Sequence, residues 1–308
     1  MIDHERAEVN GIEMAYAVAG HGKGPPVVLL HGFPESSAVW RRVMEDLAKD
    51  HYVIAPDQRG YGATSRPEGV EAYGIEHLVA DVEGLVRHLG FDRFHLVGQD
   101  WGAMVGWSYL FRHRERVIDF TTIDITHPAL FSEELQTNPE QQKASEYMLL
   151  FQSPAAEGAF AADDFAWPRQ AIFAAARALG ADLSDQEVEE WLSRWREPGA
   201  LTAQFNWYRA ARLGPPDGKG YLGGSNLLEG LDPAALHVAT PVLAIRADLD
   251  QFLLPSNFNR LHYYCNSVWI RRIEGADHWV SLEKPAVVAR YLRDFFRCQD
   301  HARDQAAR

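Results

Sequence analysis

The chain has 308 residues, of which 46% are hydrophobic and 24% charged, with a formal net charge of −13 at pH 7. This composition is ordinary for a globular protein with a sizeable core. The acidic balance argues against nucleic acid and anionic membrane surfaces as partners, because both require a basic face. No apolar run of about 18 residues and no apolar signal segment is present, so we expect a cytoplasmic protein without membrane spans.

The first 125 residues alternate short apolar runs with amphipathic stretches. The predicted strands cover residues 12–18, 26–30, 52–55, 94–97 and 117–123. The predicted helices cover residues 38–49, 74–89 and 102–113. The apolar runs are continuous rather than alternating, which is typical of strands buried on both faces of a parallel sheet. Strands that alternate with helices predict a mostly parallel, doubly wound α/β sheet.

This alternation stops after residue 126 and resumes near residue 237. The intervening segment predicts helices and no clear strand, at 139–152, 167–179, 184–195 and 201–211. Strands are then predicted at 241–246 and 268–273, and helices near 256–264 and at 285–296. We therefore expect one α/β core made of residues 1–126 and 237–308, interrupted by a helical insertion over residues 127–236.

The segment LVGQDWG at residues 96–102 indicates an apolar strand, a tight turn between small residues and a helix. It matches the G-x-S-x-G pattern of a nucleophilic serine, with Asp100 in place of the serine. A carboxylate is already anionic at neutral pH and can form an ester by attacking a carbon that bears a leaving group. Taken alone the pattern is weak, because an aspartate that caps a helix produces it as well.

A covalent ester requires donors for an oxyanion and a base for water. The segment HGFP, with His31 and Phe33, follows the predicted strand 26–30. A turn there would aim the backbone N–H of Phe33 at the same point as that of Trp101, as an oxyanion site requires. An ordinary Gly-Pro loop explains this segment equally well.

The candidate base is His278, in the segment GADHW after the last predicted strand. The chain order nucleophile, acid, histidine puts the base in this loop and the acid after the preceding strand. Asp248 and Asp250 both qualify as the acid; we choose Asp250, since Asp248 fits a turn. Asp124 is a third candidate, because it directly follows the neighbouring predicted strand 117–123.

Together, the segments at 31–34, 98–102 and 275–279 resemble those of the epoxide hydrolases of the α/β-hydrolase fold, a similarity that extends from about residue 8 to 297. Residues 57–65 also resemble the family's loop after its fourth strand. The resemblance implies an α/β-hydrolase fold with a helical cap, no cofactor and no catalytic metal. It also implies that Asp100 is the nucleophile and that His278 is the base, with Asp250 as its acid. Phe33 and Trp101 are then the two oxyanion-hole residues.

The family protonates the epoxide oxygen with tyrosines of the cap. The segment FNWYR at 205–209 matches one of these positions, so Tyr208 is the candidate acid, although a tyrosine packed on the core has the same pattern. The place of the second tyrosine is taken by Leu150, with Tyr147 one helical turn away. The sequence leaves open whether one phenol or two hold the oxygen; each well-placed acid contributes about 10²–10⁴-fold.

Dehalogenases of the same fold are the alternative, since they also use an aspartate nucleophile and a histidine base. The tetrapeptide QDWG is dehalogenase-like, and Trp101 suits halide binding, whereas haloalkane dehalogenases commonly have Asn or Glu at the position of Phe33. Haloacetate dehalogenases would use Asp124 as the acid, but they need arginines where this chain has Trp101 and Met104. A haloalkane is therefore favoured over a haloacetate.

Other classes of protein fit less well. An esterase would need the missing serine, a ligand receptor of this fold would lack a catalytic group, and the 13 histidines show no paired ligand spacing. We therefore predict a cofactor-free hydrolase that converts a small epoxide to a vicinal diol. The identity of the epoxide and the oligomeric state, a homodimer included, stay open.

Overall fold

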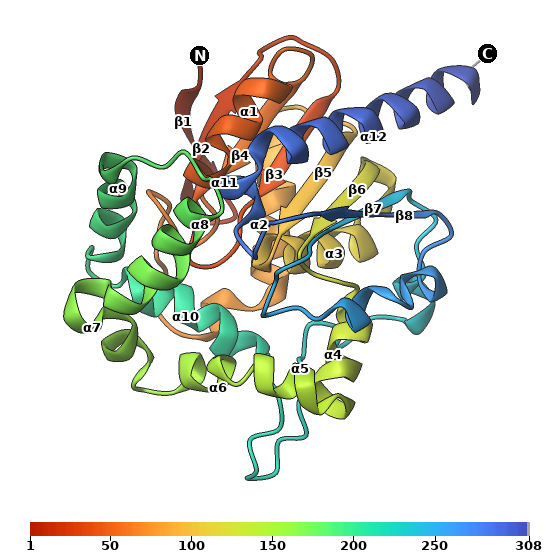
Figure 1. Ribbon diagram of the computed structural model, residues 1–308. Helices are drawn as coiled ribbons and strands as arrows, with labels where there is room; N and C mark the ends of the chain where they lie inside the picture. The colour runs from red at the N-terminus through yellow and green to blue at the C-terminus, as the bar shows by residue number, and fades with distance from the viewer. Residues whose placement is uncertain (307–308) are drawn as a thin grey trace.

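The computed structural model describes residues 1–306, and its centre is a single sheet (Figure 1). The strands follow the order β1-β2-β4-β3-β5-β6-β7-β8. Their bounds are β1 Asp3–Val9, β2 Ile12–Ala19, β3 Pro26–Leu30, β4 Tyr52–Pro56, β5 Phe94–Gln99, β6 Val117–Ile123, β7 Val242–Ala247 and β8 Val268–Ile273. Strands β3 to β8 are parallel, and β1 and β2 are antiparallel to their neighbours. The predicted mostly parallel α/β sheet is confirmed.

Strand β1 is absent from the predicted elements. Its sequence, DHERAEV, is mostly exposed, so it lacks the continuous apolar run by which the other strands were recognised. It pairs with β2 through a turn at Asn10 and Gly11, both at positive φ. Asn-Gly is a strong hairpin signal, and it was present in the sequence.

Helices cover both faces of the sheet (Figure 1). They are α1 Arg41–Leu47, α2 Ile75–His88, α3 Trp101–Arg112, α11 Val280–Glu283 and α12 Pro285–Ala306. Helix α1 packs against α12, and α2 packs against α3. The predicted helix near 256–264 is wrong, because this stretch forms two short 3₁₀ turns. The side chain of Asn257 donates there to the backbone carbonyl of Leu254 and to the side chain of Gln141, which competes with helical hydrogen bonding.

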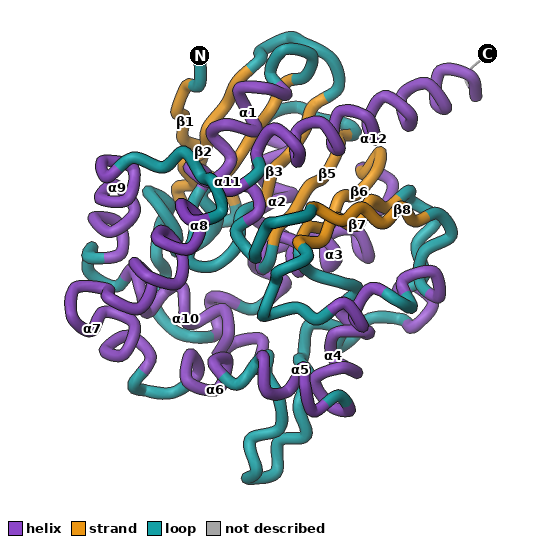
Figure 2. The backbone as a smooth tube through the Cα atoms, viewed as in Figure 1, coloured by secondary structure: helices purple, strands orange, loops and turns teal. Residues whose placement is uncertain are grey.

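Between β6 and β7 the chain is mostly helical up to Ala211 and then continues largely as a loop to β7, as Figure 2 shows. The helices are α4 Pro128–Thr137, α5 Pro139–Ala144, α6 Tyr147–Gln152, α7 Ala156–Pro168, α8 Ala175–Ala178, α9 Asp185–Trp195 and α10 Ala200–Ala211. Helices α4 and α7 were not predicted, the predicted helix 139–152 is divided into α5 and α6, and a π-helical turn precedes α8. These helices lie beyond the carboxyl ends of the parallel strands, which is where ligand sites form in such sheets.

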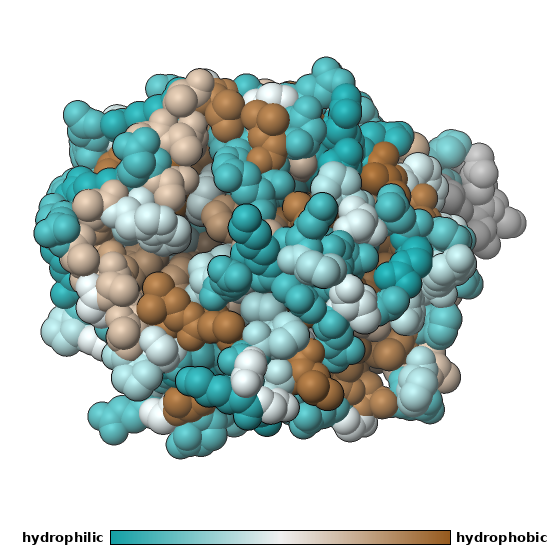
Figure 3. Space-filling model, turned by 60° about the horizontal axis from the view of Figure 1, so that its bottom comes forward, coloured by the Kyte–Doolittle hydropathy of each residue, from teal (hydrophilic) through white to brown (hydrophobic). Residues whose placement is uncertain are grey.

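The helical segment also forms part of the protein surface. The face on this side is largely hydrophilic, with apolar residues in small groups (Figure 3). Exposed apolar side chains of this segment include Leu150, Trp167 and Leu222. None of the helices in residues 1–306 is both long enough and apolar enough to cross a membrane.

Candidate active site

Asp100 occupies a sharp turn between β5 and α3. Its φ of 49° and ψ of −124° lie in a region that costs energy for a residue other than glycine. Glycines make room for this turn: a Cβ on Gly102 would lie 2.1 Å from the carbonyl oxygen of Leu30. A Cβ on Gly32 would lie 2.5 Å from the Cβ of Asp100. The Asp100 side chain is therefore held directly against the loop that follows β3.

The two carboxylate oxygens of Asp100 have different neighbours. The backbone N–H of Phe33 donates to Oδ1 at 2.8 Å. Oδ2 lies 3.5 Å from Nε2 of His278. Trp101 is the first residue of α3, so its backbone N–H has no acceptor within the helix and belongs to the positive end of the helix dipole. The structure thus brings Phe33, Trp101 and His278 to Asp100.

The loop after β3 is held by two buried side chains. The backbone N–H of Gly32 donates to Oε2 of Glu35 at 2.8 Å. Burial and the nearby Asp100 raise the pKa of Glu35 to about 8, although the Gly32 bond opposes this rise. His31 is fully buried and accepts the backbone N–H of Gln58 through Nε2, at 3.0 Å. His31 therefore joins the loop after β3 to the backbone of Gln58. Glu35 is a buried acid that the sequence analysis did not identify.

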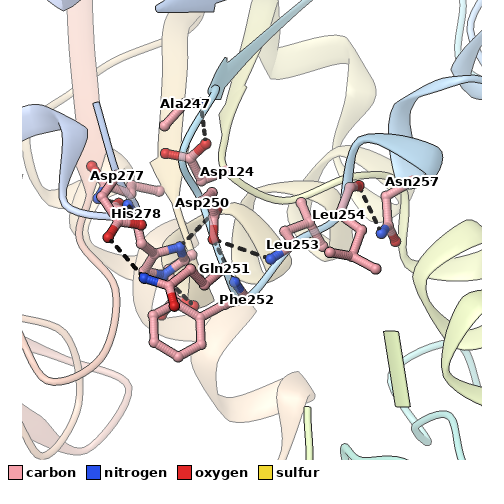
Figure 4. Close-up of polar contacts among 12 residues, drawn as sticks. Asp124, Ala247, Asp250, Gln251, Phe252, Leu253, Leu254, Asn257, Asp277 and His278 are labelled. Atoms are coloured by element: carbon pink, nitrogen blue, oxygen red, sulfur yellow. Dashed lines mark hydrogen bonds and ion pairs between the residues drawn. The ribbon is translucent and has the colours of Figure 1, made fainter. Parts of the chain in front are cut away.

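His278 is oriented by Asp250 (Figure 4). Nδ1 of His278 lies 3.0 Å from Oδ2 of Asp250, whose other oxygen accepts the backbone N–H groups of Phe252 and Leu253. Asp248 instead accepts the backbone N–H of Gly275. The structure places Asp250 beside the base and Asp248 in the turn.

Asp124 lies next to Asp250 but makes a different contact (Figure 4). Its Oδ1 accepts the backbone N–H of Ala247 at 2.7 Å. Burial and the charge of Asp250 raise the pKa of Asp124 well above its ordinary value. The raised pKa favours the neutral form of Asp124, and Asp250 is the carboxylate that contacts His278.

The charge of His278 depends on both carboxylates. Burial lowers its pKa, but the charges of Asp250 and Asp100 outweigh burial and hold the pKa well above 6.5. The imidazole is thus protonated while Asp100 carries a negative charge. Gln99 steadies the same loop, since its side-chain amide donates to the backbone carbonyl of His278 at 3.0 Å. Nothing in the motif predicted this contact, which joins β5 to a loop 179 residues later.

Two cavities meet at Asp100, with about 320 and 350 Å³ of empty space. Both are lined by the same five residues, Asp100, Tyr147, Tyr208, Phe252 and His278. One continues between Met104, Phe131 and Leu213, and the other between Phe151, Trp167 and Trp279. Among the described residues, neither lysine nor arginine lines either cavity. The arrangement suits an uncharged, apolar ligand.

Two phenols face this space from different helices, Tyr147 from α6 and Tyr208 from α10. Burial raises the pKa of both well above 10, and the charge of Asp100 adds to this rise. The Tyr208 ring packs edge-on against the ring of Trp101, with centroids 5.0 Å apart, and Tyr147 lines the same cavities as Tyr208. Both phenols therefore stay protonated and are able to donate a hydrogen bond.

The structure shows which of two side chains of α6, Tyr147 or Leu150, lies beside Tyr208. Leu150 is 43% exposed on the outer side of α6, whereas Tyr147 lines the cavity. Residues four apart share one face of a helix, and Tyr147 and Phe151 together face inward, with ring centroids 5.2 Å apart. Tyr147, and not Leu150, therefore lines the cavity together with Tyr208.

Comparisons with known proteins show the family to which this chain is similar. The family model described as alpha/beta hydrolase fold matches residues 25–285. The chain is 32% identical to the AB hydrolase superfamily protein YfhM of Bacillus subtilis, over 94% of this chain and 96% of the relative. It is also 32% identical to epoxide hydrolase A of Mycobacterium tuberculosis, over 94% and 95%. The structure of a Bacillus megaterium epoxide hydrolase in complex with an inhibitor superposes with a TM-score of 0.85 at 30% identity, covering 95% of this chain and all of that one.

Proposed function

The chain belongs to the α/β-hydrolase family, in the group that contains the epoxide hydrolases, and on this basis we propose that it opens an epoxide to a vicinal diol through an ester on Asp100. The observation that carries the proposal is the pair of buried phenols, Tyr147 and Tyr208, in the cavities above the carboxylate. Epoxide opening needs an acid at the departing oxygen, and phenols with raised pKa values supply neutral donors there.

In the first step, Oδ2 of Asp100 attacks an epoxide carbon and the carbon–oxygen bond breaks. The departing oxygen takes a proton from Tyr208, and Tyr147, which lines the same cavities, donates a second hydrogen bond to it. Ester formation removes the negative charge of Asp100, so the pKa of His278 falls. The imidazolium then gives its proton to the phenolate, which leaves His278 neutral and ready to act as a base.

In the second step, His278 takes a proton from water, and the resulting hydroxide attacks the carbonyl carbon of the ester. Negative charge develops on Oδ1, where the N–H of Phe33 already points, and the N–H of Trp101 at the start of α3 is the second donor that we expect. Collapse of this intermediate breaks the ester bond, and the second water proton leaves on the diol. Asp100 is again a carboxylate beside a protonated His278, so atoms and charge balance.

We propose further that residues 127–236 act as a cap over this chemistry. The cap supplies both phenols and much of the apolar lining, including Phe151, Trp167 and Leu213. A water-poor site of this kind strengthens the hydrogen bonds and charges on which both steps depend. The expected partner is thus a small, uncharged epoxide.

Haloalkane dehalogenation is the second candidate. Trp101 lines one cavity directly beside the nucleophile, where its side chain would meet a departing halide. The contact between this side chain and Tyr208 favours the epoxide, because it already assigns Trp101 to orienting the phenol. A haloacetate fits least, since neither lysine nor arginine lines either cavity in the described part of the chain.

A parallel assay separates these candidates. Purified protein is incubated with styrene-type epoxides, 1-haloalkanes and haloacetates, and diol and halide are measured, with Asp100→Asn as the inactive control. We expect diol from an epoxide. Halide release without diol formation would replace the proposal with the dehalogenase.

A further inference from the structure

A second group of buried polar side chains lies at the opposite end of the sheet from Asp100. His51 precedes β4, His95 lies in β5, and Asp300 lies in α12, which crosses the upper part of the sheet in Figure 1. One potential ligand atom from each residue lies within 4.8 Å of those of the other two. His95 lies near the start of β5 and Asp100 directly follows its end, five residues later, or about 16 Å at the rise of a β-strand. The group is therefore separate from the candidate active site.

Two of these side chains have ring nitrogens that lack a hydrogen bond. In the described residues, Nδ1 of His51 and Nε2 of His95 are buried and have no hydrogen-bond partner. His51 is 4% exposed and His95 is fully buried. Buried polar atoms are almost always satisfied in proteins, so two orphaned nitrogens at one point indicate a missing ligand.

The surroundings of His95 match those of a metal-binding histidine. Its Nδ1 lies 2.7 Å from Oδ2 of Asp119, an arrangement that fixes the ring and directs Nε2 away from that carboxylate. Nε2 lies 3.7 Å from Oδ1 of Asp300. Ligands at the usual 2.0–2.2 Å from a tetrahedral zinc ion are roughly 3.3–3.6 Å apart, so this pair needs little movement.

The electrostatic field at this point favours a cation. The carboxylates of Asp119 and Asp300 lie 2.7 and 3.7 Å from the two ring nitrogens of His95. The nearby guanidinium of Arg293 is paired with two other carboxylates, those of Asp46 and Asp50.

We propose that His51, His95 and Asp300 bind one divalent transition-metal ion, with Zn²⁺ as the ion that suits two imidazoles and a carboxylate. Asp119 orients His95, and the side chain of Asp300, 30% exposed, opens the site to solvent. The ion joins α12 to the amino ends of β4 and β5. It has a structural role, and the reaction at Asp100 does not use it.

The test is calorimetric titration of ZnCl₂ into the full-length, tag-free protein, in a buffer that does not chelate metals. We expect binding of one equivalent, and a Kd at least about tenfold weaker in Asp300→Asn, in His51→Gln and, through loss of ring orientation, in Asp119→Asn. Asp182→Asn is the matched control, because that side chain is 98% exposed elsewhere on the surface and its Kd should match the native value. Circular dichroism checks that each variant is folded.

Thermal unfolding supplies a second measurement. At a free zinc concentration of about 100 times Kd, we expect Tm of the native protein to rise by about 5 °C, with no rise in Asp300→Asn. Epoxide turnover should be the same with and without zinc. Absence of a one-equivalent site, or equal binding by the native protein, Asp300→Asn and His51→Gln, would overturn the proposal and leave an ion pair between His95 and the carboxylates.

Discussion

Oδ1 of Asp100 accepts the backbone N–H of Phe33 at 2.8 Å, so one of the two carboxylate oxygens is already held before any substrate arrives. The other, Oδ2, lies 3.5 Å from Nε2 of His278, and Asp100 lines both cavities. In the mechanism that we propose, the two oxygens act in different steps. Oδ2 attacks, and Oδ1 becomes the ester carbonyl oxygen that the Phe33 N–H stabilises when water adds.

We predict that His278→Gln accumulates the ester on Asp100. The variant keeps the nucleophile and both phenols but lacks the base that activates water. Intact mass spectrometry should show an adduct equal to the mass of the epoxide, located on the peptide that contains Asp100. Asp100→Asn/His278→Gln should show no adduct. An unmodified His278→Gln protein after incubation with an epoxide that the native enzyme turns over would rule out the covalent step.

Both phenols should contribute to ester formation. We predict that Tyr147→Phe and Tyr208→Phe each slow alkylation by roughly 10–100-fold, and that the double variant loses the full contribution of the acid, about 10²–10⁴-fold or more. Stopped-flow quenching of tryptophan fluorescence measures this step. Leu150→Ala is the matched control on the same helix, since Leu150 is exposed and its loss should change nothing. A larger effect in Leu150→Ala than in Tyr147→Phe would contradict the placement of the two side chains.

The two acids beside His278 should respond differently to amide substitution. Asp250→Asn removes the charge that orients and stabilises the imidazolium, so we expect ester hydrolysis to slow by roughly 10²–10⁴-fold. A raised pKa favours the neutral form of Asp124, and an asparagine keeps the oxygen that accepts the Ala247 N–H. Asp124→Asn should therefore stay within a few fold of the native rate. Single-turnover kinetics of both variants decide between the acids, and the reverse order of effects would assign the role to Asp124.

The pKa of His278 should fall when Asp100 loses its charge. Asp250 and Asp100 both raise this pKa, so Asp100→Asn, which imitates the neutral ester, removes one of the two contributions. Titration of the His278 ring by NMR in the native protein and in Asp100→Asn measures the difference. The mechanism requires the lower value in the variant, and equal values would mean that ester formation does not free the base.

Glu35 should make the protein less stable as pH rises. Its pKa is about 8 in the folded state against 4.5 as the ordinary value, so the folded state retains a proton that the unfolded state releases. Stability from this group is present below about pH 4.5 and is lost as pH rises toward 8. Glu35→Gln should flatten the dependence of unfolding free energy on pH in this range, measured by urea denaturation. An unchanged slope would show that Glu35 titrates normally.

Most of the correct predictions came from short motifs and from their order along the chain. The turn at Asp100, the HGFP loop and the loop at His278 each follow an apolar strand, and the carboxyl ends of parallel strands meet at one edge of the sheet. The sheet and the family could therefore be predicted from short segments. Strand β1 could not, because its exposed, charged pattern has no continuous apolar run.

By itself, the sequence determined local features that lie within a single turn of the chain. It identified Asp100 as the residue at the sharp turn after β5, and it identified the loops beside that turn. Only the tertiary structure decided between side chains that the sequence leaves equivalent. Asp250 and Asp124 both follow strands, but only Asp250 contacts His278. Packing between distant segments places the Tyr147 phenol in the cavity. It also brings together the group formed by His51, His95 and Asp300. Such contacts are fixed by how helices and strands pack in three dimensions, and no spacing along the chain encodes them.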